Sequence, residues 1–282
     1  MKNKMMKMVA LMLALVLALG CLAGCNSSST KAKVIDLALS SEEYAFAVAK
    51  DDAEFLAKVN QFLDEIKDNG KFDEICNNYF GDGEPKKFES AELDENADQL
   101  VVATSTGFEP FEMVENGMYY GVDMEIAYYL AEALGLELVI QDMDFDAVVN
   151  SVQSGICDIG MAGLSVTPAR EKVVTFTDSY YNASQVVIVP EDDTTFDACT
   201  TGEEVAEILA GLDASTKIGC QGGTTGELYI KGDADYEFDG LAAEAASYKY
   251  VALAITAMQQ GQVKYVIADN GPAKAITAKM NG

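Results

Sequence analysis

Arg170 is the single arginine of this 282-residue chain, which has 19 basic residues in all. It follows Thr167 and Pro168, at the expected start of a helix. A guanidinium binds a carboxylate through two parallel hydrogen bonds, whereas lysine offers only a point charge. Because every other basic position is lysine, we expect Arg170 to bind a ligand carboxylate. The alternative is an ordinary surface arginine.

Asp269 is a second candidate, because it lies between an expected strand at 264–268 and a helix with Pro272 near its first turn. An aspartate at this position often caps the helix by accepting a backbone N–H hydrogen bond. The other role is to face the ammonium group of a ligand. The two roles are compatible, since one carboxylate oxygen can cap the helix while the other binds.

A glycine-rich segment, Gln221-Gly-Gly-Thr-Thr-Gly226, joins an expected strand to an expected helix. Glycines let the backbone approach a ligand, and free N–H groups at a helix start favour an anion. Plain turn chemistry is the alternative. The segment lacks the lysine of a phosphate-binding loop and does not match G-x-G-x-x-G, so we expect no nucleotide site.

The composition excludes several classes of function. Without histidine, the chain has no Ser-His-Asp or Cys-His pair and no histidine-ligated metal. It also lacks a C-x-x-C motif, so we expect no metal site and no cofactor. Cys199 and Cys220 form either a disulfide or free thiols. A formal charge of −27 argues against nucleic acid and anionic headgroups as partners.

The N-terminus has the organisation of an exported lipoprotein. Three lysines precede an apolar run from Met8 to Leu19, which is too short to span a bilayer and is typical of a signal peptide. The run leads into Leu22-Ala-Gly-Cys25, which resembles the bacterial lipobox. We therefore expect a signal peptide at 1–24, lipidation of Cys25 and a tether at 25–31. An uncleaved membrane anchor is the alternative.

An alternation of strands and helices must position the candidate residues. It predicts parallel sheets covered by helices on both faces. In such sheets ligands bind beyond the carboxyl ends of the strands. The expected strands are 33–37, 44–49, 100–104, 137–140, 157–161, 217–220 and 264–268, and the expected helices are 53–69, a short one ending at 81, 123–135, 144–154, 201–211, 225–231, 244–260 and 271–280. The residues that follow strand ends are Ser105, Gly163 to Ser165, Gln221 to Thr225, and Asp269.

Spaced motifs cover much of the chain, among them Gly121-Val-Asp-Met-Glu125, Asp158-Ile-Gly-Met-Ala-Gly-Leu-Ser-Val-Thr-Pro-Ala-Arg170 and Ile218-Gly-Cys-Gln-Gly-Gly-Thr-Thr-Gly-Glu227. A further motif runs from Leu100 to Glu112. In this combination the chain resembles the bacterial solute-binding proteins of family 3, the amino-acid receptors of ABC importers. The resemblance implies an α/β fold of the type 2 periplasmic-binding kind, with two lobes joined by a two-strand hinge.

The order of the motifs is unusual for that family. Its members normally end with a strand, a long helix and Tyr-Phe-Gly, which here stand at 33–81, ahead of the family's usual beginning at Leu100. We therefore expect a circular permutation in which 82–99 joins the usual termini, in a monomer. A domain-swapped dimer is the alternative. The lobes would comprise 46–184 for lobe 1, and 32–41 with 189–282 for lobe 2.

The resemblance implies an amino-acid clamp with groups from both lobes. Arg170 would bind the ligand carboxylate together with the amide of Thr225. Asp269 would bind the ammonium group, and the Gly163 carbonyl and the Ser165 hydroxyl would complete the clamp. The free amino acid would then favour the closed form, because only that form makes both sets of contacts.

The same resemblance assigns the surroundings of the ligand side chain. Phe108 and Phe145 would sandwich it, and Gln221 and Thr224 would border it; the alternative for both aromatic rings is a core position. Family members that bind basic amino acids or glutamine commonly have Asp where this chain has Ser105. The absence of that carboxylate favours a neutral polar or apolar ligand.

Together these observations predict an extracytoplasmic lipoprotein, anchored to the outer face of the cell membrane, that binds an amino acid and delivers it to the membrane permease of an ABC importer. We expect a receptor and not an enzyme. One alternative is a dehydratase of cyclic carboxylic acids, in which a Glu, Asp or Tyr would have to act as the general acid. Another is a receptor that passes its ligand to a sensor.

Overall fold

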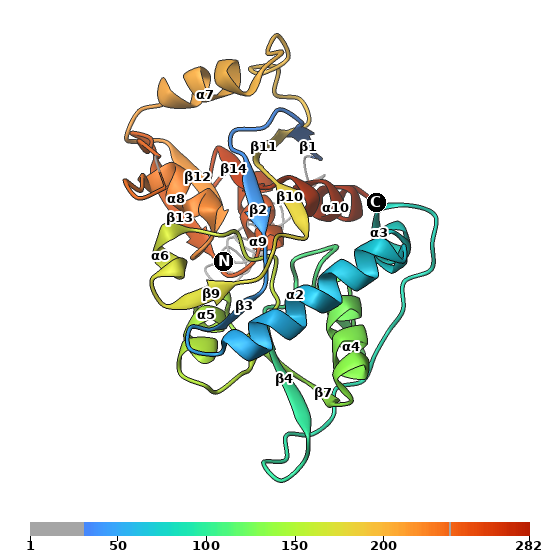
Figure 1. The fold of residues 1–282 in the computed structure, drawn as a ribbon. Helices are drawn as coiled ribbons and strands as arrows, with labels where there is room; N and C mark the ends of the chain where they lie inside the picture. The colour runs from blue at the N-terminus through green and yellow to red at the C-terminus, as the bar shows by residue number, and fades with distance from the viewer. Residues whose placement is uncertain (1–30, 237) are drawn as a thin grey trace, which may run out of the picture. The chain divides into compact units, whose positions relative to one another are not determined.

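The computed structural model describes residues 31–236 and 238–282, so the predicted signal peptide and Cys25 lie outside the described residues. Two five-stranded sheets organise this part of the chain (Figure 1). We call the sheet β7-β4-β8-β3-β9 with its helices lobe 1, and the sheet β1-β11-β14-β12-β13 with its helices lobe 2. The predicted two-lobed α/β fold is confirmed.

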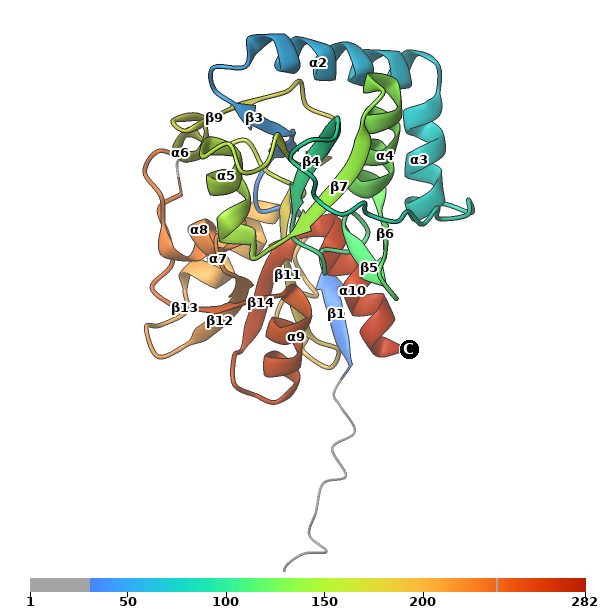
Figure 2. The same ribbon diagram turned by 90° about the horizontal axis from the view of Figure 1, so that it is seen from below.

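In lobe 1, strand β4 is parallel to β7 and β8, whereas β3 is antiparallel to β8 and β9. Neighbouring residues of β4 face opposite sides: Val102 packs in the cluster with α2, α3 and α4, and Ala103 packs in the cluster with α5. Figure 2 shows α3 and α4 side by side next to β7. The elements of lobe 1 are β3 Ala47–Ala49, α2 Ala53–Asp68, α3 Lys71–Phe80, β4 Gln99–Thr104, β5 Met113–Glu115, β6 Met118–Tyr120, α4 Val122–Leu134, β7 Glu137–Asp142, α5 Phe145–Gln153, β8 Ile159–Gly160, α6 Pro168–Glu171 and β9 Val174–Phe176.

In lobe 2, strand β12 is parallel to β13 and β14, and β11 is antiparallel to β1 and β14. Val187 and Val189 pack in a cluster with residues of α7 and α8, whereas Val186 and Ile188 pack with residues of α9 and α10. Helices therefore cover both faces of this sheet. The elements of lobe 2 are β1 Ala32–Ile35, β11 Gln185–Pro190, α7 Gly202–Ala210, β12 Lys217–Gln221, α8 Thr225–Lys231, β13 Glu244–Tyr248, α9 Val251–Gln259, β14 Tyr265–Asp269 and α10 Asn270–Asn281.

Two paired segments connect the lobes. Strand β2 (Glu42–Tyr44) runs from lobe 2 towards β3 of lobe 1, and β10 (Tyr181–Ala183) runs from lobe 1 towards β11 of lobe 2. They pair antiparallel, with Tyr44 opposite Tyr181 and Glu42 opposite Ala183, and they lie side by side in Figure 1. Because β2 alternates, Glu42 and Tyr44 are buried while Glu43 is exposed.

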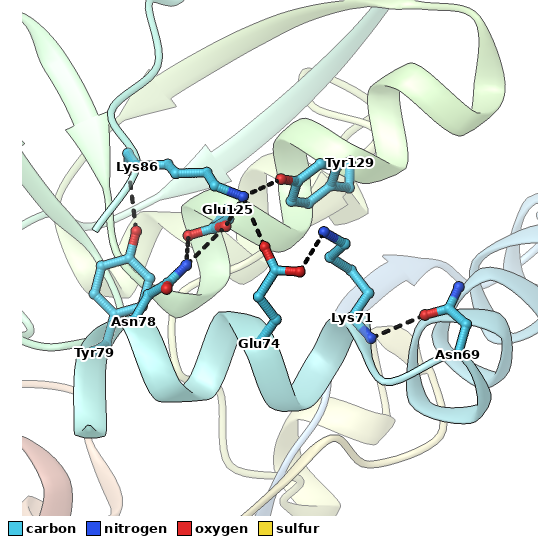
Figure 3. A network of polar contacts seen from close by, with 8 residues as sticks. All are labelled: Asn69, Lys71, Glu74, Asn78, Tyr79, Lys86, Glu125 and Tyr129. Carbon is cyan, nitrogen blue, oxygen red and sulfur yellow. Dashed lines mark hydrogen bonds and ion pairs between the residues drawn. The ribbon is translucent and has the colours of Figure 1, made fainter. Parts of the chain in front are cut away.

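Residues 82–99 have no periodicity, yet they pack closely on lobe 1. Phe88 exchanges two backbone hydrogen bonds of 2.8 Å with Tyr119, and its ring stacks on Tyr128. The Lys86 ammonium donates to the Tyr129 hydroxyl at 2.8 Å and lies 3.5 Å from a carboxylate oxygen of the fully buried Glu125 (Figure 3). This segment is therefore part of the lobe and not a loose connection.

The predictions for 244–260 and for the cysteines need correction. The expected helix at 244–260 is wrong in its first part, because 244–248 form β13, which pairs with the neighbouring strand β12. That pairing overrides a sequence with little preference for either structure. Cys199 and Cys220 are free thiols, so the disulfide alternative is wrong. No helix in the described ranges is long and apolar enough to cross a membrane.

Candidate functional site

Arg170 lies in α6, where its backbone N–H donates to the hydroxyl of the N-cap residue Thr167. Its guanidinium reaches across the lobes: Nη1 donates to the Ser165 carbonyl at 2.6 Å, and Nη2 donates to the Gly223 carbonyl of lobe 2 at 3.1 Å. The guanidinium carbon lies 5.2 Å from the centre of the Phe145 ring. Two of the five N–H donors of a guanidinium are used by these contacts within the described ranges, which leaves three for a ligand. Burial lowers the pKa of Arg170, against the opposing effect of nearby Asp269.

The hydrogen bond between the Arg170 guanidinium and the carbonyl of residue 223 depends on a glycine at that position. Its φ is +75°, and a Cβ atom here would lie 1.7 Å from a carboxylate oxygen of Asp146 in lobe 1. Two neighbours of Gly223 are buried and joined, since the Thr224 hydroxyl donates to the Gln221 carbonyl at 2.8 Å. The Gln221 side-chain oxygen is buried and has no hydrogen-bond partner among the described residues. The predicted glycine-rich loop therefore approaches lobe 1 closely at its tip.

Glu42 of the connecting strand β2 is a central acceptor that the sequence reasoning missed. Its side chain is 3% exposed. One carboxylate oxygen accepts from the Ser40 hydroxyl at 2.6 Å. The other accepts from the hydroxyls of Ser165 in lobe 1 and Thr225 in lobe 2, both at 2.7 Å. Two residues predicted to hold a ligand are therefore bridged by one carboxylate.

Asp269 is buried at the end of β14 and at the N-cap position of α10, but its side chain makes no capping hydrogen bond. One carboxylate oxygen instead accepts from the Tyr44 hydroxyl at 2.7 Å. Burial, followed by the negative charge of Glu42, raises the pKa of Asp269 to about 7. Asp269 therefore faces the interior between the lobes, where a cation would favour its charged form.

A second pair of buried carboxyls, Asp123 and Glu112, belongs to lobe 1. Asp123 accepts from the Gly163 backbone N–H at 2.9 Å and from the Tyr180 hydroxyl at 2.6 Å. Gly163 has φ +52°, and a Cβ there would lie 2.7 Å from the Phe108 ring. Glu112 is fully buried, and burial, followed by the charge of Asp123, raises its pKa well above the usual value. Asp123 therefore holds Gly163 in its unusual conformation.

Phe108 and Phe145, the two rings predicted to sandwich the ligand side chain, differ in burial. Phe108 is 5% exposed and belongs to the main core cluster, with its ring centre 6.5 Å from that of Tyr44. Phe145 is only partly buried and lies under the Arg170 guanidinium. Ser105 is buried and follows the carboxyl end of β4.

Ion pairs at the rim also join the two lobes. Lys172 of lobe 1 pairs with Asp235 of lobe 2 at 2.6 Å, and Lys249 of lobe 2 pairs with Asp144 of lobe 1 at 2.7 Å. Lys279 of α10 pairs with Glu109 of lobe 1. These lysine side chains are more than half exposed. The structure is therefore a closed arrangement, with buried contacts at the centre and exposed pairs around them.

A cavity of about 600 Å³ opens beside Glu42, lined by Ser40, Ser41, Glu42, Glu43, Val166, Asn182, Tyr236 and Phe238. Tyr236 comes from the loop after α8, and the charge of Glu42 helps burial to raise its pKa. No cluster of acidic or cysteine side chains in the described ranges could hold a metal ion.

The geometry joins most of the predicted residues into one site. Arg170, Ser165 and Thr225 are linked through shared hydrogen bonds, and Asp269 lies near enough to Arg170 to raise its pKa against the effect of burial. Glu42 had a detectable signal, because alternation in β2 places it on the same buried face as Tyr44. Tyr236 had none, since it lies in an irregular loop.

The comparison with protein families now identifies the fold. Residues 100–268 match the model of the bacterial extracellular solute-binding proteins, family 3. The chain belongs to this family. The match begins at the predicted usual start of the family and leaves 31–99 of this family 3 protein outside it.

Several curated relatives of this family 3 protein are named as amino-acid-binding proteins. The arginine-binding extracellular protein ArtP of Bacillus subtilis is 36% identical over 94 residues, which are 33% of this chain and 37% of that protein. A probable histidine-binding protein of Campylobacter jejuni is 24% identical over 64% of this chain and 63% of its own length. The chain thus spans less than two thirds of the length of either relative.

Solved structures agree with this assignment of the fold. Holo ArgBP from T. maritima is 32% identical, with a TM-score of 0.54 over 65% of this chain and 74% of that chain. An ancestral amino acid-binding protein, described as a precursor of cyclohexadienyl dehydratase, is 29% identical, with the same TM-score and the same coverage.

Proposed function

We propose that this protein binds a free amino acid between its two lobes and delivers it to the permease of an ABC importer. The observation that carries the proposal is the position of Arg170. Its guanidinium lies at the junction of the lobes, with three N–H donors that no described residue occupies, close to the buried carboxyl of Asp269. This pairing of one anion-binding group and one cation-binding group is complementary to the carboxylate and ammonium of an amino acid.

In this proposal, the ligand stabilises closure. Arg170 and Ser165 come from lobe 1, and Thr225 and Asp269 come from lobe 2. The paired strands β2 and β10 form the hinge, and the lobes follow the boundaries 46–184 and 189–282 with 32–41. A ligand that contacts both lobes favours the state in which both sets of contacts exist. The permease would recognise that closed state.

The class of ligand side chain depends on the charge of the site. The relatives described above are named for arginine and histidine. The site holds the carboxyls of Glu42 and Asp269 against a single guanidinium, and this excess of acid favours a cationic side chain. Ser105, where an Asp is common for basic ligands, favours a neutral one. We propose the cationic class first and the neutral polar class second.

The proposal extends to export and chain order. The signal peptide at 1–24 would direct export, and the lipid on Cys25 would then anchor a monomer to the outer face of the cell membrane. The circular permutation is supported by the family match, which starts at residue 100. It is also supported by the close packing of 82–99, which connects the end of α3 to β4. Mass spectrometry of the mature protein would detect a lipid on Cys25.

Two other functions remain as alternatives. A dehydratase is the first, because one structural relative, itself described as an amino acid-binding protein, is a precursor of cyclohexadienyl dehydratase. In that case Asp269, with its pKa near 7, would be the candidate general acid. Delivery of the ligand to a sensor is the other alternative. Steady-state turnover of a cyclic carboxylic acid would support the enzyme, and an importer encoded beside the gene would support transport.

A thermal-shift screen of the amino acids on residues 26–282 tests the proposed function. A ligand present at about 100 times its Kd stabilises the folded state by about 2.7 kcal/mol. We expect stabilisation by one chemical class of amino acid, arginine and lysine first. Cyclic carboxylic acids without an amino group belong in the same screen. Stabilisation by these acids alone would favour the enzyme, and no shift with any compound would refute the proposal.

A further inference from the structure

We propose that Glu42 fixes the direction of the hydroxyl hydrogen bonds at the site, and that it thereby selects ligands that carry an amino group. The inference rests on the proposed function and deepens it, because it names a residue that determines specificity. It begins with the position of Glu42 on β2, at the junction of the two lobes and buried.

The Ser165 hydroxyl has a single proton, and the geometry directs that proton to Glu42. The distance from the Ser165 hydroxyl to the carboxylate oxygen is 2.7 Å. A carboxylate has only acceptor positions, so the hydroxyl must be the donor. The lone pairs of Ser165 then remain for another partner, and that partner must be a donor.

Thr225 has the same arrangement on the lobe 2 side. Its hydroxyl donates to the same oxygen of Glu42 at 2.7 Å and accepts from the Gln185 amide at 2.9 Å. Ser165 therefore keeps two acceptor lone pairs and Thr225 keeps one, and neither hydroxyl has a proton left to donate to a ligand. A ligand carboxylate, which only accepts, gains nothing from either hydroxyl, whereas an ammonium group can donate to them.

The charge of Glu42 acts in the same direction. Within the described ranges Glu42 forms no ion pair with lysine or arginine, and its partners are the hydroxyls of Ser40, Ser165 and Thr225. Its charge also contributes to the raised pKa of Asp269. These two carboxyls share the Arg170 guanidinium, whose pKa both affect, and two neighbouring carboxyls attract a further cation, which the ammonium group of a ligand can supply.

This arrangement has a consequence for specificity. Arg170 can hold the carboxylate of many acids, with or without an amino group. The hydroxyls directed by Glu42, together with Asp269, form favourable contacts only with a ligand whose ammonium group donates hydrogen bonds to them. Glu42 itself does not touch the ligand, so it is a positioning residue that acts through Ser165 and Thr225.

The test compares two ligands on two matched variants. The ligands are the amino acid identified by the screen and its analogue with hydrogen in place of the amino group. The variants are Glu42→Gln and the control Glu89→Gln, which makes the same chemical change at an exposed residue of lobe 1 that does not line the cavity beside Glu42. Titration calorimetry, with displacement for weak ligands, gives four affinities besides those of the unchanged protein.

We expect Glu42→Gln to weaken binding of the amino acid at least about 10-fold, which corresponds to about 1.4 kcal/mol. Binding of the analogue without the amino group should stay within about 2-fold or improve, because an amide lacks the charge and offers a donor. Glu89→Gln should leave both affinities unchanged. Equal losses for both ligands, or no loss for either, would overturn the inference.

A second variant keeps the inference testable if Glu42→Gln fails to fold. Ser165→Ala removes one acceptor without adding a charge, and it should weaken binding of the amino acid more than binding of the analogue. Equal effects on the two ligands would contradict the role of the hydroxyl. If the unchanged protein binds no amino acid, then the proposed function has failed, which is a different outcome from either of these.

Discussion

Glu42 and Glu125 are both buried glutamates, but their partners differ. Glu125, in α4, is fully buried and is 3.5 Å from the Lys86 ammonium and 3.2 Å from the Asn78 amide (Figure 3). Glu42 has three hydroxyl partners and no cation among the described residues. A buried charge requires a partner, and of these two glutamates only Glu125 has a charged one within the described ranges.

The difference separates a structural glutamate from one that belongs to a binding site. At Glu125 the positive charge comes from 82–99, so the chain itself completes the network. At Glu42 the hydroxyls satisfy the hydrogen bonds, and the Arg170 guanidinium, whose pKa both carboxyls affect, is shared with Asp269. The predictions below test whether the negative charge between the lobes is held for a ligand, while the charge in α4 serves the stability of lobe 1.

The largest expected effect is that of Arg170→Ala on ligand affinity. Two charged hydrogen bonds of about 1.5–3 kcal/mol each would be lost, so affinity should fall at least about 100-fold. Arg170→Lys is the matched control, because it keeps the charge but loses the planar fork. Calorimetry measures both, with circular dichroism to verify the fold. Unchanged binding by Arg170→Ala would contradict the proposal that Arg170 binds the ligand carboxylate.

Affinity should also depend on pH through Asp269, whose pKa is raised to about 7. Below about pH 7 a ligand ammonium must displace a proton from Asp269, so affinity should fall by up to about 10-fold per pH unit. Calorimetry from about pH 5 to about pH 8 measures the slope. Asp269→Asn should abolish this dependence, and an unchanged slope in that variant would contradict the assignment.

The same pKa has an opposite consequence for the ligand-free protein. The pKa of Asp269 is raised from its ordinary value of 3.8 to about 7 in the folded state, so the folded state binds the proton more tightly than the unfolded chain does. The stability contributed by this group is present at low pH and is lost as pH rises towards about 7. Denaturant unfolding of Asp269→Asn against the unchanged protein should isolate this contribution.

A smaller effect is expected at Glu125. Lys86→Met removes the ammonium group that lies 3.5 Å from that carboxylate, which keeps its contact with Asn78, and should lower the free energy of unfolding by about 1–3 kcal/mol. Ligand affinity should not change. Lys87→Met is the control, because its partner Glu115 is exposed and such pairs contribute about 0–1 kcal/mol. Equal losses of stability in the two variants would contradict the claim that the buried Glu125 depends on its lysine more than the exposed Glu115 does.

The smallest effect is expected at the rim. Lys172→Ala removes an exposed ion pair between the lobes, and exposed pairs contribute about 0–1 kcal/mol. Affinity should fall by less than about 5-fold, and the difference from the unchanged protein should shrink as salt is added. A loss comparable to that of Arg170→Ala would mean that the rim, and not the buried centre, stabilises closure.

Much of the fold was predictable from local patterns. Apolar runs such as 100–104 and 264–268 correctly predicted β4 and β14, and their carboxyl ends pointed to Ser105 and Asp269. The segment 244–248 was not predictable, because its strand depends on pairing with β12. Residues 82–99 were interpreted as a linker, since their contacts through Phe88 and Lys86 follow no periodicity.

The candidate site was predictable in its charged residues and less so in its supporting ones. Arg170 and Asp269 were singled out by rarity and by position. Glu42 was missed because adjacent glutamates in an acidic chain suggest a solvated surface, and only alternation in β2 separates buried Glu42 from exposed Glu43. Its role depends on hydroxyls more than 120 residues away, and no local pattern contains that information.

The central claim is that an amino acid lies between the lobes with its carboxylate on Arg170. A crystal structure of the complex with the amino acid found in the screen tests it most directly. We predict the ligand carboxylate within hydrogen-bonding distance of the Arg170 guanidinium, and the ammonium group at Asp269 and the Ser165 hydroxyl. A ligand bound elsewhere, or one whose carboxylate contacts neither Arg170 nor Thr225, would contradict the account.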